Sequence, residues 1–298
     1  MSQPITDGFL PFKGYRTWYK IVGDREAPGK LPLLLLHGGP GAGHDYLWPL
    51  AEMARTGRRV IFYDQLGCGL SHINESKPKM WTVDLYCEEI DTVRKALGLE
   101  RIHLLGQSWG GMLAMEYLIR QPRGVASATI ASSPASMVQW VEEANHLREQ
   151  LPSDVNAILQ KHEAAGTTDS PEYQSAMMEF YNRHVCRVVP HPDYVQRTFA
   201  KLAEHPEVYQ TMNGPSEFHV TGTLKDWDVT GQLHRISVPT LVTSGRHDEA
   251  TPRIARTVHE GIRGSEWVLF ENSSHMAHVE EAEAYMRVLE RFIGQHEP

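Results

Sequence analysis

The stretch that decides the fold is RIHLLGQSWGGM, residues 101–112. It begins as an apolar run typical of a buried strand and continues as a helical pattern, and Gly106, Ser108 and Gly110 form G-x-S-x-G at the junction. A serine on so tight a turn takes a strained backbone conformation, so its neighbours two residues away on either side must have almost no side chain. We therefore predict that Ser108 is a nucleophile. The alternative is a glycine-rich helix start with an ordinary capping serine.

Strand-like and helical patterns alternate on both sides of this stretch. The leucine-rich segment LPLLLLHG is typical of a parallel strand that is covered on both faces. We expect strands at residues 17–22, 31–38, 58–64, 101–108, 125–134, 239–245 and 266–272. We expect helices at residues 82–98, 110–122 and 278–294, and one that starts at Pro252. This order predicts an α/β fold with an open, mostly parallel sheet and helices on both faces.

The alternation stops near Ser133 and resumes with PTLVTSG at residue 239. Between these points the sequence shows helical patterns and no convincing buried strand. We predict a core formed by residues 1–134 and 234–298, with residues 135–233 inserted between the two parts as a helical cap.

Composition limits the possible partners and location. The chain has 298 residues and a formal net charge of −8, so it has no basic surplus with which to bind nucleic acid or an anionic membrane. Three scattered cysteines suggest neither a disulfide framework nor a zinc site. No signal-peptide pattern precedes the first strand, and the longest apolar run is too short for a bilayer. We expect a cytoplasmic protein.

The segment HGGPG, residues 37–41, follows the leucine-rich strand. An acyl-transfer serine needs N–H donors aimed at the developing oxyanion, and backbone groups provide them without reorganisation. The residue after the nucleophile, Trp109, would give one donor. Pro40 has no N–H, so Gly38 or Gly39 would give the other, and we favour Gly39. A plain tight turn is the alternative, but it does not explain why the glycines lie at the carboxyl end of a strand.

An acid and a base complete the predicted catalytic triad. In sheets of this kind the acid and then the histidine follow the nucleophile along the chain, on loops after late strands. Asp248 follows PTLVTSG, and His275 follows EWVLFENSS. We predict that His275 accepts the Ser108 proton and that Asp248 orients the imidazole and stabilises the imidazolium. A histidine on a surface turn is the alternative.

Asp64, in FYDQLGCGLS, also ends a strand, and we expect it to shape the turn before Gly67 and Gly69. The sequence contains no GxGxxG, Walker or HExxH pattern, so we expect neither a cofactor nor a metal.

The motifs HGGPG, GQSWGG, FYDQLGCGLS, MNGPSEF and SGRHDEATP together resemble the proline iminopeptidase family of α/β-hydrolases. The resemblance extends from about Tyr15 to Phe292 and is greatest to the branch with the tricorn-interacting aminopeptidase and the L-amino-acid amidases. It implies the α/β-hydrolase fold and release of an amino-terminal residue, often proline, from peptides or amides. The family's triad and oxyanion positions fall on the residues named above.

The resemblance also implies that Glu217 and Glu249 bind the free α-ammonium group of the substrate. Without it, Glu249 would be read as an acid at a helix N-terminus and Glu217 as a solvated acid of the cap. A carboxylesterase or lactonase on the same scaffold is the alternative function, and a non-catalytic ligand receptor is a third. A dehalogenase or epoxide hydrolase is disfavoured, because its nucleophile at this position would be an aspartate. The sequence leaves open whether the natural substrate is a peptide, an amide or an ester.

Overall fold

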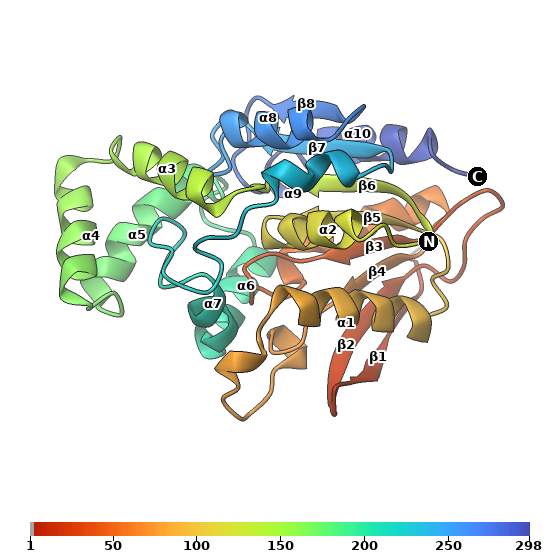
Figure 1. The fold of residues 1–298 in the computed structure, drawn as a ribbon, viewed down its shortest axis with the longest axis horizontal. Coiled ribbons are helices and arrows are strands. Elements are labelled where there is room, and N and C mark those ends of the chain that lie inside the picture. The colour runs from red at the N-terminus through yellow and green to blue at the C-terminus, as the bar shows by residue number, and fades with distance from the viewer. Residues whose placement is uncertain (1–2) are drawn as a thin grey trace.

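The computed structural model describes residues 3–298, which form an eight-stranded sheet in the order β1-β2-β4-β3-β5-β6-β7-β8 (Figure 1). The strands are β1 (Ile5–Phe12), β2 (Tyr15–Val22), β3 (Leu33–Leu36), β4 (Val60–Tyr63), β5 (Ile102–Gln107), β6 (Val125–Ala131), β7 (Thr240–Gly245) and β8 (Glu266–Phe270). From β4 to β8 every neighbouring pair is parallel, whereas β1 and β2 are antiparallel. The predicted open, mostly parallel sheet is therefore confirmed.

Helices connect the strands and cover the sheet. The α-helices are α1 (Val83–Ala96), α2 (Trp109–Ile119), α3 (Met137–Arg148), α4 (Ser153–Ala165), α5 (Pro171–His184), α6 (Asp193–Glu204), α7 (Glu207–Met212), α8 (Pro252–Gly261), α9 (Ala277–Glu280) and α10 (Ala282–Gly294). Short 3₁₀ segments are η1 (Asp45–Thr56), η2 (Gly69–Ser71), η3 (Pro78–Met80) and η4 (Thr230–Arg235). Thr82 caps α1 by accepting the Leu85 N–H, so this helix begins at the predicted boundary.

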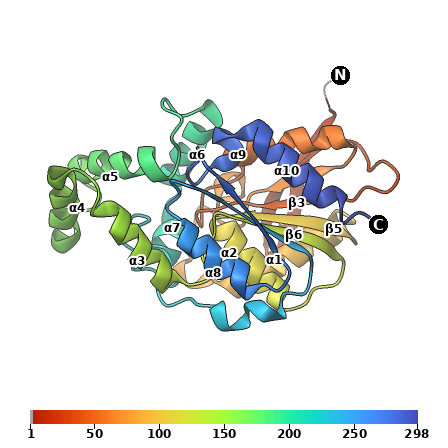
Figure 2. The same ribbon diagram turned by 90° about the horizontal axis from the view of Figure 1, so that it is seen from above.

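The leucines of β3 show how the core is divided between the two faces of the sheet. Leu34 and Leu36 pack into an apolar cluster with α1, α2 and α8, whereas Leu33 and Leu35 pack into another with η1, α9 and α10. Successive side chains of a strand point to opposite faces, so a run of four leucines fits a strand that is covered on both sides. The helices lie on both faces of the sheet in Figures 1 and 2.

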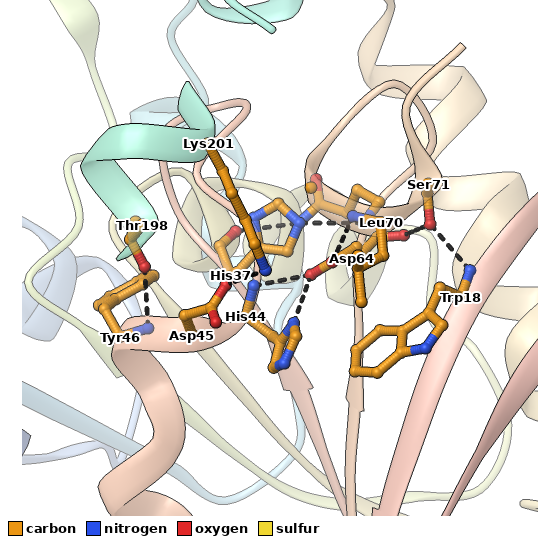
Figure 3. A network of polar contacts seen from close by, with 12 residues as sticks. Trp18, His37, His44, Asp45, Tyr46, Asp64, Leu70, Ser71, Thr198 and Lys201 are labelled. Carbon is orange, nitrogen blue, oxygen red and sulfur yellow. Dashed lines mark hydrogen bonds and ion pairs between the residues drawn. The ribbon is translucent and has the colours of Figure 1, made fainter. Parts of the chain in front are cut away.

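The segment between β6 and β7 holds α3 to α7 and no strand of the sheet. In Figures 1 and 2 its helices α3, α4 and α5 extend away from the end of the sheet. Buried Phe180 and Phe218 of this segment belong to the same apolar cluster as Leu33 and Leu35, so it packs continuously with the core. Polar contacts hold α6 to η1: Lys201 Nζ lies 2.6 Å from Asp45 Oδ2 (Figure 3).

Strand β1, segment η1 and the short segments η2 and η3 were not predicted, and one predicted helix is divided in the structure. Strand β1 contains Gly8 and Pro11 and buries only Leu10 and Phe12, so it lacks the apolar pattern of a core strand. Segment η1 has Pro49 in its interior, which weakens a helical pattern. The predicted helix at 278–294 is two helices, α9 and α10.

Within residues 3–298, no helix combines the length and the apolar character that crossing a membrane requires.

Candidate active site

Ser108 lies on the predicted turn between β5 and α2, with φ 57° and ψ −125°. A Cβ atom on Gly106 would collide with the Gly110 carbonyl, and one on Gly110 would collide with the Leu36 carbonyl. Both positions therefore require glycine. The Ser108 side chain makes no capping hydrogen bond to α2, which contradicts the alternative of an ordinary capping serine. The turn leaves the hydroxyl available for chemistry.

Asp248 and His275 meet through a short hydrogen bond. Nδ1 of His275 donates to Asp248 Oδ1 at 2.7 Å, and both side chains are buried. The same carboxylate accepts the backbone N–H groups of Ala250 at 2.7 Å and Gly245 at 3.3 Å, which fix its orientation at the end of β7. The bond at Nδ1 leaves Nε2 as the nitrogen that can take a proton from a nucleophile.

The loop that carries His275 is tied to the residue before Ser108. Gln107 Nε2 donates to the His275 carbonyl at 3.0 Å. The Tyr46 hydroxyl donates to the side-chain oxygen of Gln107, so both ends of the Gln107 amide are hydrogen-bonded. Among residues 3–298, Ser108 Oγ is not hydrogen-bonded to His275, and the charged neighbour of Nε2 is Glu249, whose Oε1 lies 3.6 Å away.

The two glycines that could give the second oxyanion donor differ in the structure. Gly38 already donates its N–H to Tyr46 Oη at 2.8 Å, so its N–H is committed within the protein. Gly39 has φ 110°, a conformation that favours glycine, and lines one cavity together with Ser108 and Trp109. Trp109 is the first residue of α2, where backbone N–H groups have no acceptor within the helix. This geometry favours Gly39 over Gly38.

The turn after β4 supports this region, as Figure 3 shows in part. Asp64 accepts the Leu70 N–H at 2.8 Å and both the N–H and the Nδ1 of His44, at 2.7 and 2.8 Å. Burial alone would raise the pKa of Asp64, but the charge and hydrogen bonds of His44, with His37 and the Leu70 N–H, lower it to about 2. The predicted turn-shaping role of Asp64 is confirmed.

The neighbouring Gln65 was not predicted, although it lies in the same motif. Its Oε1 accepts the indole N–H of Trp109 at 2.8 Å, and its Nε2 donates to the His37 carbonyl at 2.9 Å. Its backbone N–H also donates to His37 Nε2 at 2.9 Å. Gln65 therefore joins the two segments that hold the predicted oxyanion donors.

Glu217 and Glu249 lie beside the acid–base pair. Glu249 is only 1% exposed, and its Oε2 has no hydrogen-bond partner in the described part of the chain. Burial, Glu217 and Asp248 raise the pKa of Glu249 well above its usual value. Glu217 lines the Ser108 cavity and accepts the Tyr209 hydroxyl at 2.6 Å, and burial raises its pKa. These surroundings contradict the alternatives of a solvated cap acid and of an acid that serves only a helix N-terminus.

Three residues near the site were not predicted, and no motif marks them. Tyr209 contacts Glu217, as described above. Trp140 of α3 donates its indole N–H to the Glu217 carbonyl at 2.7 Å, and its ring meets that of His275 edge-on, with centroids 6.0 Å apart. The carbonyl of His184, at the end of α5, accepts the backbone N–H groups of Glu249 and His275, both at 3.2 Å. The inserted helices thus contact both halves of the site.

The strand order, the turn at Ser108 and the late acid–base pair define an α/β-hydrolase, and residues 32–282 match the family described as alpha/beta hydrolase fold. A proline iminopeptidase of Saccharolobus solfataricus is 40% identical over 98% of this chain and 93% of its own length. The crystal structure of proline iminopeptidase from Mycobacterium smegmatis is 46% identical with a TM-score of 0.91, covering 98% of each chain. The crystal structure of VinJ is also 46% identical, with a TM-score of 0.95, and covers 98% of this chain and 99% of its own.

The chain belongs to the proline iminopeptidase family. It is therefore an enzyme with the α/β-hydrolase fold, which argues against the non-catalytic receptor.

Proposed function

We propose that this protein is a serine aminopeptidase that releases the amino-terminal residue, preferentially proline, from short peptides or amino-acid amides. The observation that carries the proposal is the buried Glu249 together with the half-buried Glu217, which lie beside the Asp248–His275 pair. Two carboxyl groups in a desolvated space are costly unless they meet a cation, and the free α-ammonium of a substrate is such a cation. The names of the relatives agree with this substrate class.

In the proposed reaction Ser108 Oγ attacks the carbonyl carbon of the first residue while its proton passes to His275 Nε2. The N–H groups of Gly39 and Trp109 stabilise the oxyanion of the tetrahedral intermediate. His275 then gives the proton to the departing amine, which leaves an acyl group on Ser108. Water, deprotonated by His275, hydrolyses this acyl-enzyme and restores the serine, while Asp248 stabilises the imidazolium in both halves.

The cavity at Ser108 supports a small apolar first residue. Besides the catalytic elements it is lined by Met112, Met137, Trp140 and Leu224, with Glu217 as its charged residue. The chemistry of this lining suits a pyrrolidine ring, because carbon atoms pack on apolar side chains and an ammonium group pairs with a carboxyl group. A blocked amine brings no charge to Glu217 and Glu249, so it is expected to bind poorly.

A panel of amino-acid anilides, led by proline and alanine and each with a free or an acetylated amine, tests the proposal. We expect rapid cleavage of the free proline anilide, little cleavage of its acetylated form, and loss of both in Ser108→Ala. A carboxylesterase or lactonase would act on the free and the acetylated forms at similar rates. That result would contradict the proposal and favour the esterase or lactonase. Labelling by an organophosphorus reagent, lost in Ser108→Ala, tests the nucleophile independently.

The proposal includes residues 135–233 as a cap domain over the site. In its support, this segment contributes Trp140, Tyr209 and Glu217 to the surroundings of Ser108 and His275. Residues 1–134 and 234–298 then form the hydrolase core.

A cytoplasmic location is also proposed. Cys68, Cys87 and Cys186 are buried free thiols in the described residues, which suits a reducing compartment.

A further inference from the structure

The hydroxyl of Thr251 does not form the hydrogen bond that its place in the chain favours. Thr251 precedes Pro252 at the start of α8, where a threonine side chain commonly accepts a backbone N–H of the first helical turn. It makes no such capping bond, and its hydroxyl instead donates to Glu143 Oε2 of α3 at 2.5 Å. Positions where a distant contact replaces a local preference are often functional.

Glu143 is a strong acceptor for this hydroxyl. Its side chain is only 13% exposed, and its other oxygen accepts from Arg253 Nη1 at 2.7 Å. Burial alone would raise the pKa of Glu143, but the hydrogen bonds from Thr251 and Arg253 lower it below its usual value. Glu143 is therefore a carboxylate near pH 7, and the bond from Thr251 is charge-assisted.

The helix that carries Glu143 also contacts the other half of the amine site. Trp140 lies three residues before Glu143 in α3, so the two side chains share one face of this helix. The Trp140 indole N–H donates to the Glu217 carbonyl at 2.7 Å. One helix thus holds the backbone at Glu217 directly and the segment of Glu249 through Thr251, two residues further along the chain.

We propose that Glu143 is a positioning residue, which acts through Thr251 to set the place of Glu249 relative to Glu217 and thereby makes the enzyme selective for an amino-terminal proline. This inference rests on the proposed function, because it concerns the two carboxyl groups that bind the substrate's amine there. In this scheme Glu143 does not touch the substrate.

Glu249 depends on this contact more than Asp248 does. Asp248 is held by His275 and by two backbone N–H groups. In the described part of the chain Glu249 Oε2 has no hydrogen-bond partner, so the direction of this side chain depends on its backbone. That backbone is held at the His184 carbonyl, which accepts the Glu249 N–H at 3.2 Å, and again at Thr251.

The geometry of the substrate's amine explains why this placement selects proline. The ammonium group of an amino-terminal proline has two N–H bonds, and the ring fixes the direction of both. Two carboxyl groups bind it well only at one relative placement. The ammonium group of alanine has three N–H bonds and rotates about its bond to Cα, so it can adjust to a displaced partner. A displaced Glu249 should therefore weaken binding of proline more than binding of alanine.

The first experiment uses Thr251→Val, which removes the hydroxyl and nearly keeps the shape. We expect kcat/KM for free proline anilide to fall about tenfold or more, mainly through KM, and that for free alanine anilide about threefold or less. Hydrolysis of p-nitrophenyl acetate, an ester without an amine, should stay within about twofold of the parent value, which also shows that the variant is folded. Thr251→Ser keeps the hydroxyl and should retain the proline preference.

The second set of variants tests whether Glu143 and Thr251 act through one bond. Glu143→Ala should lose proline preference to the same extent as Thr251→Val. The double variant should lose no more than about twofold beyond either single variant, because the bond is already absent in each. The matched control is Arg253→Gln, which removes the other partner of Glu143 at an exposed position. It should leave the ratio of the two anilide rates within about twofold of the parent ratio.

Several results would overturn the inference and leave the proposed function intact. One is a loss with alanine anilide in Thr251→Val that equals or exceeds the loss with proline anilide. Others are no loss with either anilide, additive losses in the double variant, and an equal loss with the ester, which would mean that Thr251 acts on the Asp248–His275 pair. The proposed function would fail instead if the parent cleaved acetylated proline anilide as readily as the free form.

A binding measurement removes the influence of turnover. In the Ser108→Ala background, L-prolinamide and L-alaninamide are titrated into the protein in a calorimeter, with and without Thr251→Val. The added substitution should raise Kd for prolinamide about tenfold and that for alaninamide about threefold or less. Equal weakening of both would overturn the inference. Absence of prolinamide binding to Ser108→Ala alone would count against the proposed function.

Discussion

Gln65 accepts the indole N–H of Trp109 at 2.8 Å, although the two residues are far apart in the sequence. The same side chain donates to the carbonyl of His37, at the start of HGGPG. One buried amide thus sets the spacing between the Gly39 segment and the residue after Ser108. Oxyanion stabilisation depends strongly on such spacing, because the donors must be aimed before the charge develops.

Gln65→Met should therefore reduce kcat by about tenfold or more, with a smaller change in KM. Misplaced N–H donors stabilise the transition state less, whereas they contribute little to binding of the substrate in its ground state. Steady-state kinetics with free proline anilide measures this split. Gln139→Met serves as a control, because it removes another side-chain amide, a partly buried one that donates to Thr257, away from the site. Equal losses in both variants would indicate a general effect on folding.

Tyr209→Phe should raise KM for free-amine substrates several-fold while changing kcat little. The hydroxyl donates to Glu217 Oε1 at 2.6 Å, so its loss leaves this carboxyl group less well oriented for an ammonium ion. The internal control is an ester without an amine, whose hydrolysis should be unaffected. A comparable loss with that ester would mean that Tyr209 acts on the catalytic groups instead.

The sequence predicts well the backbone positions on which the candidate site is built. Ser108, Gly39 and Asp248 lie where a strand ends, and the required glycines and the strand patterns mark such positions without any knowledge of packing. The sequence did single out the segment that contains Gln65. The contact of Gln65 with Trp109, however, depends on where β4 and β5 lie in the sheet, which local sequence patterns do not determine.

The cap contributions could not be predicted in the same way. Trp140 contributes an indole N–H and His184 contributes its backbone carbonyl. No sequence pattern indicates that either group contacts the site. Their positions depend on how amphipathic helices pack on one another, which local periodicity does not determine. Strand β1 was missed for a related reason, since it is an edge strand stabilised mainly by pairing with β2.

Gly110→Ala should destabilise the fold by several kcal/mol and abolish activity, because the new Cβ would overlap the Leu36 carbonyl and displace either α2 or β3. Gly231→Ala is a matched control, since a Cβ there meets nothing within 4 Å and the residue lies in η4. Urea unfolding of both variants gives the comparison. Equal stability of the two variants would contradict the proposed packing of the turn.

Glu89→Gln should change how stability depends on pH. Glu89 is fully buried and accepts hydrogen bonds from Thr17 and from the Leu66 N–H. Burial raises its pKa from 4.5 to about 8, with a contribution from Asp64 and in spite of these hydrogen bonds. The folded state therefore keeps a proton that the unfolded chain loses above about pH 4.5, so parent stability should fall between there and about pH 8.

The slope of that fall is at most about 1.4 kcal/mol per pH unit for one such group. Glutamine carries no titrating proton, and its carbonyl can still accept the Leu66 N–H while its amide donates to Thr17. Relative to the parent, Glu89→Gln should thus gain stability as the pH rises from about 5 to about 8. Urea unfolding of both proteins at the two pH values measures the difference. A constant difference would show that Glu89 is ionised in the folded protein, and the burial argument for its raised pKa would then be wrong.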